Sequence, residues 1–238
     1  MRFVLPILTL LLMSLPALAQ DMPFQLGDGG SLTTRSVQLL VLITLLSLVP
    51  ALAVMVTCFP FIVTVLSILR QAIGLPQAPP NMLIVSLSIF LTWYVMDPVF
   101  TEAWNRGVEP LTRNQVDIQT AFHDGIAPFR TFMAGRLDGD TFAALQALRP
   151  GEKSAPIDSP LSLLVPSFLL SEIQRAFEIG FLIYLPFLII DLVVAAVLMS
   201  MGMMMVSPSI VSMPFKLAFF VVADGWSLVS GALVRSYF

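Results

Sequence analysis

Few residues in this sequence combine a type and a spacing that could carry out chemistry. His123 is the only histidine and Cys58 the only cysteine, which excludes a two-histidine metal motif, an internal disulfide and a cysteine metal cluster. The sequence contains neither GxSxG nor GxxxxGKS/T, the patterns of a serine-nucleophile turn and a phosphate-binding loop. We predict a surface or capping role for His123, a buried inert thiol for Cys58, no enzymatic activity, and no cofactor or metal.

Two charges lie inside apolar runs and are more informative. Asp191 stands in FLIIDLVVAA and Lys216 in MPFKLAFF. A lone charge among such neighbours costs several kcal/mol unless it is paired or hydrated, so each side chain needs a partner. Their opposite signs leave two main alternatives, a pair within the chain that closes a helical hairpin or a pair between subunits of an oligomer. A proton or ion relay is a third alternative.

Between these two charges the chain is rich in methionine. The residues are Met199, Met201, Met203, Met204 and Met205. Consecutive residues cannot all point to one side of a helix or strand. We expect Gly202 to loosen the backbone and Pro208 to end the helix. We therefore predict a pliable apolar loop between two helices. Such thioethers ordinarily fill gaps in a core, but in several copies around an axis they would form a deformable apolar constriction.

A third polar feature is the spacing of Glu172, Arg175 and Glu178, which recur every three residues. On a helix this spacing places the side chains on about a third of the circumference. We predict a polar stripe that faces either solvent or another subunit.

The composition predicts the kind of elements that position these residues. Charged residues make up 11% of the chain, against about 25% in an average soluble domain, and hydrophobic residues make up 57%. These values are typical of a membrane protein or a membrane complex, and no run of Lys or Arg indicates nucleic acid binding. Residues 1–19 resemble a signal peptide ending in Ala17-Leu18-Ala19, with an uncleaved anchor as the alternative. Residues 20–36 would then form a periplasmic N-terminal segment.

The remaining chain divides into two hydrophobic regions and a polar insert. We predict a hydrophobic helical hairpin region over residues 37–104, and a second hydrophobic helical hairpin, which contains the methionine loop, over residues 161–238. Residues 105–160 have a soluble composition and predict a small helical insert, in which Asp140 is a plausible N-cap. No alternating pattern indicates strands, so we predict an all-α fold of kinked helices and hairpins that forms a helical oligomeric assembly.

Prolines recur throughout both hydrophobic regions. Each removes a backbone donor and bends or breaks a helix. We expect interruptions at Pro50, Pro60, Pro98, Pro166 and Pro186.

The distribution of positive charge does not fit four ordinary membrane spans. With a cleaved signal, four spans place the polar insert in the periplasm, and this insert carries six of the twelve Lys and Arg residues. The two cytoplasmic connections offer only Arg70 and Lys216, although positive residues normally favour the cytoplasmic side. Either the orientation is reversed, or the helices do not rest as lipid-facing spans and have protein neighbours that satisfy the backbone groups freed by proline.

The most specific motifs are MGMMM at 201–205 and the PFKL…DGW pattern that begins at Pro214. Earlier segments, PLTRNQVDIQTAFHDGIAPFRTFM and SEIQRAFEIGFLIYLP, belong to the same pattern. On these motifs the chain resembles the FliP family of flagellar export proteins, whose type III secretion counterparts share them. The signal peptide favours the flagellar branch.

The resemblance implies a core channel-forming subunit of the flagellar type III protein export gate. In that family a pentamer assembles with FliQ and FliR and associates with FlhB and FlhA. The assembly lies in the inner membrane and the flagellar basal body, with much of it on the periplasmic side, and it passes unfolded flagellar proteins.

The resemblance also assigns roles to particular residues. It implies that the methionines form a gasket, and that charge pairs at Arg130, Asp191 and Lys216 hold subunits together. The main alternative is a small ion channel or proton-coupled transporter with Asp191 and Asp224 as its relay.

Overall fold

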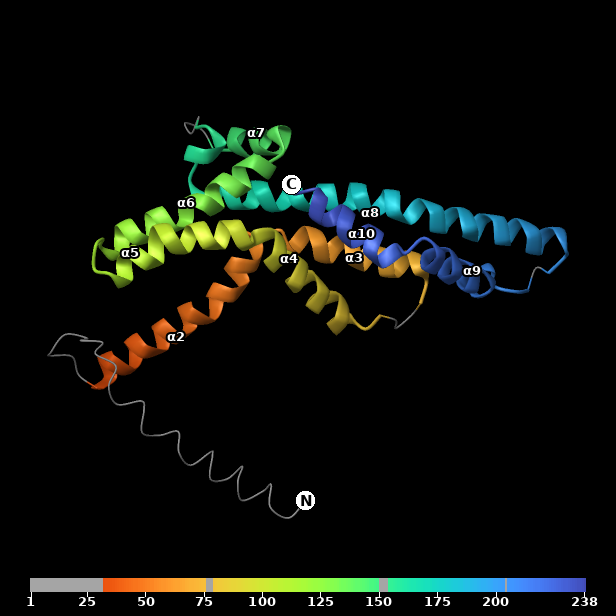
Figure 1. Ribbon diagram of the computed structural model, residues 1–238, viewed down its shortest axis with the longest axis horizontal. Coiled ribbons are helices and arrows are strands. Elements are labelled where there is room, and N and C mark those ends of the chain that lie inside the picture. Colours follow the sequence, from red (N-terminus) through yellow and green to blue (C-terminus); the bar gives the residue numbers. More distant parts are fainter. Residues whose placement is uncertain (1–31, 76–78, 150–153, 204) are drawn as a thin grey trace, which may run out of the picture. The chain divides into compact units, whose positions relative to one another are not determined.

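The computed structural model describes residues 32–75, 79–149, 154–203 and 205–238, and the regular elements in these ranges are all helical (Figure 1). They are α2 (Leu32–Met55), α3 (Phe59–Ile73), α4 (Asn81–Ala103), η1 (Trp104–Val108), α5 (Glu109–Thr112), α6 (Ile118–Arg136), α7 (Gly139–Ala147), η2 (Pro156–Asp158), α8 (Leu161–Ser200), α9 (Pro208–Val222) and α10 (Gly225–Arg235). The all-α prediction is confirmed. The predicted signal peptide and positions 20–31 lie outside the described residues.

The chain separates into two units, one up to Leu48 and one from Val49 onward. In the first unit the structure describes the N-terminal part of α2. Its described apolar side chains, such as Leu40 and Ile43, are more than half exposed. This part of the helix therefore presents apolar surface that has no cover within its own unit.

Helix α3 is the centre of the second unit. Its side chains Phe61, Ile62, Val65 and Leu66 are completely buried, and α3 packs mainly against α8 and α4. The approach to α8 is close at Gly180, where an added Cβ would lie 2.4 Å from Cδ1 of Ile68. The glycine thus allows the two helices to pack more tightly than any other residue would.

The prolines end fewer helices than we predicted. Helix α8 continues for 40 residues through Pro166 and Pro186, α4 continues through Pro98, and α2 continues past position 50. For Pro166 the structure gives a reason, because the carbonyl of Ser162 that loses its helical partner accepts a hydrogen bond from Arg149 at 3.4 Å. The predicted breaks at these four prolines are therefore wrong, while the predicted bends stay predictions.

Pro60 does mark a helix boundary. It lies in the first turn of α3, where a backbone N–H has no helical partner to lose. The first hydrophobic region is therefore divided into α2 and α3 just before this proline.

The polar insert is helical, as predicted. The N-cap of its helix α7 is Asp138, and not Asp140 as we predicted. An Asp138 carboxylate oxygen accepts hydrogen bonds from the backbone N–H and the hydroxyl of Thr141, both at 2.8 Å. These bonds, the backbone one first, hold the pKa of Asp138 below its usual value. The insert packs onto α8 through a small core of Met133, Leu164 and Phe168.

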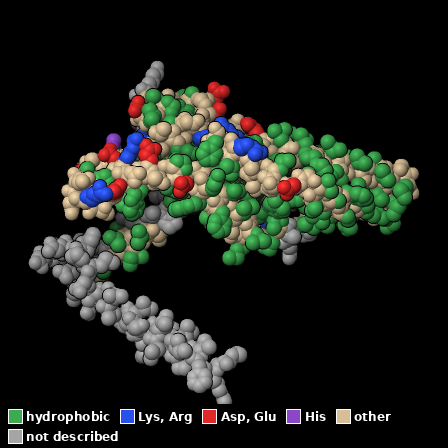
Figure 2. All heavy atoms as spheres, in the orientation of Figure 1, with side chains coloured by type: hydrophobic (Ala, Val, Ile, Leu, Met, Phe, Trp, Pro, Cys, Tyr) green, Lys and Arg blue, Asp and Glu red, His purple; other side chains and the backbone are tan. Residues whose placement is uncertain are grey.

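Two helical stretches among the described residues are long and apolar enough to cross a membrane, Asn81–Thr112 and Leu161–Ser200. The number rises to four if each of two bent helix pairs counts as one span. A 40-residue helix is about 60 Å long, twice the roughly 30 Å of a bilayer core, so α8 has length to spare beyond a simple crossing. Figure 2 shows that apolar side chains cover the visible face along the C-terminal part of α8 and α9, where charged side chains are sparse.

Candidate functional site

The methionine segment is a tight turn whose backbone geometry is fixed at the end of α8. Gly202 has a φ of 74°, in the left-handed region that favours glycine. Its N–H donates to the carbonyl of Met199 at 3.1 Å, and the N–H of Met203 donates to the carbonyl of Leu198 at 3.0 Å. This pair of bonds is the Schellman arrangement that ends helices. Gly202 therefore ends α8.

Pro208 has a different role from the one that we predicted. It is the first residue of α9, where its fixed φ suits the start of a helix. The sequence signal at Ser207-Pro208 thus marks the beginning of the next helix and not the end of the previous one. The connection between α8 and α9 spans only residues 201–207.

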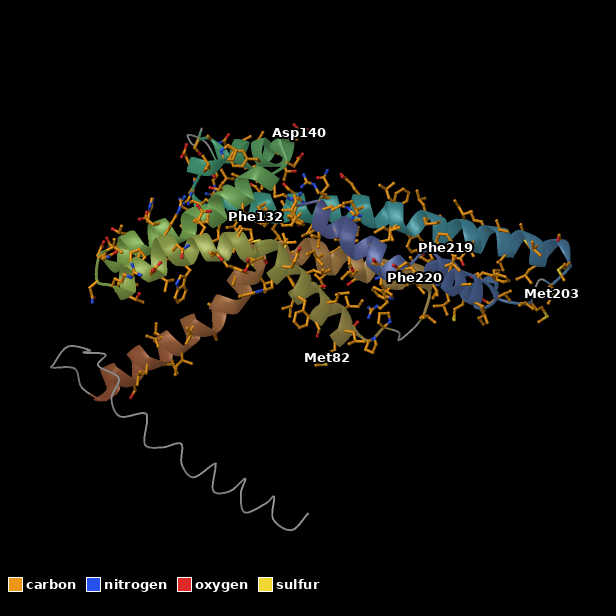
Figure 3. All side chains as sticks on the ribbon, viewed as in Figure 1. Met82, Phe132, Asp140, Met203, Phe219 and Phe220 are labelled. Carbon is orange, nitrogen blue, oxygen red and sulfur yellow. The ribbon has the colours of Figure 1, made fainter. Side chains whose placement is uncertain are left out.

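The methionine side chains of this turn are not packed into a core. Met199 and Met201 are 62% and 66% exposed, Met203 is 41% exposed and Met205 is completely exposed. Figure 3 shows Met203 at the end of the α8–α9 hairpin. Met204 lies outside the described residues. Within a single chain, gap-filling does not explain why these residues are methionines.

Asp191 and Lys216 meet within one chain, which is the first of the alternatives left open by the sequence. The Lys216 Nζ donates to Asp191 Oδ2 at 2.6 Å, and the Ser212 hydroxyl donates to Asp191 Oδ1 at 2.5 Å. The Lys216 side chain is 6% exposed and that of Asp191 is 28% exposed. The pair joins α8 to α9 about two turns from the methionine turn on each side.

Lys216 also connects this hairpin to α3. Its Nζ donates to the carbonyl of Ala72 at 3.1 Å, close to the left-handed C-cap at Gly74. This carbonyl lies in the last turn of α3, where helical carbonyls lack partners. The buried ammonium of Lys216 therefore bonds to acceptors on both α8 and α3, and it holds the α8–α9 hairpin against α3.

Arg130 does not form part of this arrangement. Its guanidinium donates to the carbonyls of Ser159 at 2.8 Å and Ile157 at 3.2 Å. Arg130 thus fastens α6 to the segment that precedes α8. Its predicted role in a charge pair between subunits stays a prediction.

The main feature that the sequence did not reveal is a buried charge cluster around Glu172. This carboxylate is completely buried, accepts a hydrogen bond from Arg136 Nε at 3.1 Å, and accepts another from the Tyr237 hydroxyl. Arg175 approaches it at 3.7 Å. For Glu172 the predicted solvent- or subunit-facing stripe is therefore wrong, whereas Glu178 is exposed.

Arg136 extends this cluster to the C-terminal residues. Its Nη1 donates to the carbonyl of Ser236 at 2.8 Å, and its guanidinium carbon lies 4.0 Å from the centre of the Tyr237 ring. The cluster therefore joins α6, α8 and the residues after α10. Its members are far apart in the sequence, so local spacing gave no signal for it.

Other polar candidates lie apart from the methionine hairpin. His123 is exposed and hydrogen-bonds to Asp124 at 3.1 Å, in agreement with the predicted surface role. Asp224 is exposed in a left-handed turn between α9 and α10. Among the described residues, no group of three or more His, Cys, Asp or Glu could hold a metal ion.

Comparison with known proteins identifies the family. The FliP family model matches residues 42–233. The flagellar biosynthetic protein FliP of Caulobacter vibrioides is 48% identical over 229 residues, covering 95% of this chain and 86% of that protein. The FliP proteins of Agrobacterium fabrum and Aquifex aeolicus are 45% and 42% identical, covering 99% and 97% of this chain and 99% and 98% of their own lengths. The chain therefore belongs to the FliP family of flagellar biosynthetic proteins, which are components of the flagellar export apparatus and not enzymes.

Proposed function

We propose that this chain is the core channel-forming subunit of the flagellar type III export gate and that its methionine turn is the gasket of that channel. The observation that carries the proposal is the exposure of four described methionines, one at the end of α8 and three in the turn that follows, on a hairpin joined by the Asp191–Lys216 pair. Exposed apolar side chains gather where another surface is meant to cover them. Methionine suits a seal that must deform, because its unbranched thioether adapts to irregular partners.

The rigid and the compliant parts of the hairpin have separate roles in this proposal. The Schellman turn at Gly202 and the ammonium of Lys216 fix the backbone, so each copy presents its methionines at the same height. Several copies around an axis would then bury these side chains against one another and exclude water and ions. A passing unfolded chain would displace flexible side chains without unfolding the hairpin.

We propose the finer assembly on the same basis. Five copies would assemble with FliQ and FliR, then with FlhB and FlhA, inside the basal-body ring, with much of the complex on the periplasmic side of the inner membrane. Residues 1–19 would be the signal peptide, 20–36 a periplasmic segment, 37–104 and 161–238 the hydrophobic hairpin regions, and 105–160 the polar insert. Contacts between subunits would be supported by Arg130, Asp191 and Lys216, because these side chains hold in place the segments of backbone that meet the neighbouring copy.

Cross-linking tests whether the methionine turns of different copies meet. Cys58 is buried and is the only cysteine, so a Cys58→Ala background carrying Met205→Cys has one reactive thiol per chain. Oxidation of the assembled complex should give covalently linked copies of this chain. Leu148→Cys, exposed in the polar insert, is the matched control and should give none. Equal cross-linking at both positions, or none at Met205→Cys, would contradict the proposal.

A further inference from the structure

Asp97 is an isolated charge on an apolar helix. It is the only charged residue of α4 between Met82 and Thr101, in a stretch that is apolar and long enough to cross a membrane. Asp97 is exposed, and among the described residues nothing hydrogen-bonds to it or forms an ion pair with it. A carboxylate in such a setting is paired or hydrated, and a protein group that pairs with Asp97 would come from outside the described part of the chain.

The surroundings of Asp97 favour a positively charged partner. Asp97 lines an open pocket of about 450 Å³ together with Trp93, Tyr94, Pro98 and Phe238. Trp93 and Tyr94 precede Asp97 by one helical turn, and these two residues are 63% and 65% exposed. Electron-rich ring faces beside a carboxylate are the combination that attracts a cation.

The residues that line the pocket distinguish between kinds of cation. One carboxylate supplies too few oxygen ligands for a divalent metal ion. A lipid amine carries a phosphate next to it, and that phosphate would be brought close to the Asp97 carboxylate. A guanidinium has no such neighbour, stacks on an aromatic face and donates two parallel hydrogen bonds to a carboxylate.

We propose that this pocket binds an arginine side chain of a neighbouring subunit in the export apparatus. The inference rests on the proposed assembly of the chain with other export-gate subunits. Phe238 contributes to the pocket from the C-terminal end of the described chain, so the arginine would contact α4 and that end together. Asp97 would be a recognition residue for assembly, outside the methionine gasket.

Asp97→Asn tests the charge without changing the shape of the side chain. We expect the amount of export-gate complex recovered with the tagged full-length chain from detergent-solubilised membranes to fall about tenfold, because the partner cation loses its counter-charge on burial. Asp97→Glu should restore part of it. Asp140→Asn, at an exposed acid of the polar insert, is the matched control and should leave recovery unchanged. Normal recovery with Asp97→Asn would overturn the proposal.

A photoreactive phenylalanine analogue in place of Trp93 identifies the partner. We expect a cross-linked peptide that belongs to an export-gate subunit and contains arginine. Exchanging charges, with Asp97→Arg and that arginine changed to Asp, should restore the complex lost in the Asp97→Arg single variant. Cross-links to lipid alone, or a charge exchange without rescue, would overturn the proposal.

The gasket proposal is tested independently of this pocket. If Asp97→Asn complexes assemble normally while Met205→Cys still cross-links between copies, only the pocket inference fails. If Asp97→Asn reduces assembly, and Met205→Cys gives no cross-links in complexes that retain Asp97, the gasket proposal fails and the pocket proposal stands.

Discussion

Replacing Lys216 by methionine should destabilise the hairpin that carries the methionine turn. The substitution keeps an unbranched apolar stem but removes the ammonium that bonds to Asp191 at 2.6 Å and to the carbonyl of Ala72 at 3.1 Å. Breaking a fully buried pair from one side costs about 3–5 kcal/mol. Asp191 is 28% exposed and keeps its bond from Ser212, so we expect a loss of about 2–3 kcal/mol in the free energy of unfolding.

A double-mutant cycle isolates the pair itself. Asp191→Asn alone should also destabilise the chain, because it leaves the ammonium buried. The double variant should be more stable than the sum of the two losses predicts, with a coupling of about 1–2 kcal/mol. The measurement is denaturant-induced unfolding of the full-length chain in detergent micelles. Arg235→Met is the matched control, since Arg235 is exposed, and it should change stability by less than about 0.5 kcal/mol.

Strict additivity of the two single variants would refute this reasoning. It would mean that Asp191 and Lys216 do not interact within one folded chain. The energetic basis for holding the methionine turn in place would then be lost.

Three further predictions concern the supporting fold. Tyr237→Phe removes the hydroxyl that donates to buried Glu172 and should cost about 1.5–3 kcal/mol in unfolding free energy, whereas Tyr184→Phe, which lacks that contact, should cost less than about 1 kcal/mol. Gly225→Ala places a Cβ 2.1 Å from the Phe220 ring, so we expect about 1–3 kcal/mol of destabilisation, while Gly135→Ala, with open space around it, should not destabilise. The lowered pKa of Asp138 stabilises the folded state above about pH 4, and this contribution is lost as pH falls through the folded pKa. Melting temperatures measured from pH 2 to pH 6 should therefore depend less on pH in Asp138→Asn; identical profiles would rule out this role.

The sequence predicted the helical class and the main regions because long apolar runs and the absence of alternation are local signals. It predicted too many interruptions, because the effect of a proline depends on what satisfies the freed carbonyl. At Pro166 that group is Arg149, and no local rule relates these two positions. The position where α8 ends was likewise assigned to Pro208, whereas the left-handed backbone of Gly202 determines it.

The candidate site shows the same division between local and distant signals. Asp191 and Lys216 could be predicted because isolated charges in apolar runs need partners, and because their opposite signs indicated that they could pair with each other. Glu172 was misjudged because its periodic spacing with Arg175 and Glu178 resembles a surface stripe. Its burial depends on Arg136 and Tyr237, which approach it only in the folded chain.

The most direct test of the gasket is ion conductance across membranes that contain the assembled export gate. Deleting residues 203–205 should produce a leak that the wild-type complex lacks. Replacing the same three methionines by leucine retains apolar volume and should leak far less than the deletion. Equal tightness of the deletion and the wild-type complex, with both fully assembled, would contradict the account and place the closure of the channel elsewhere.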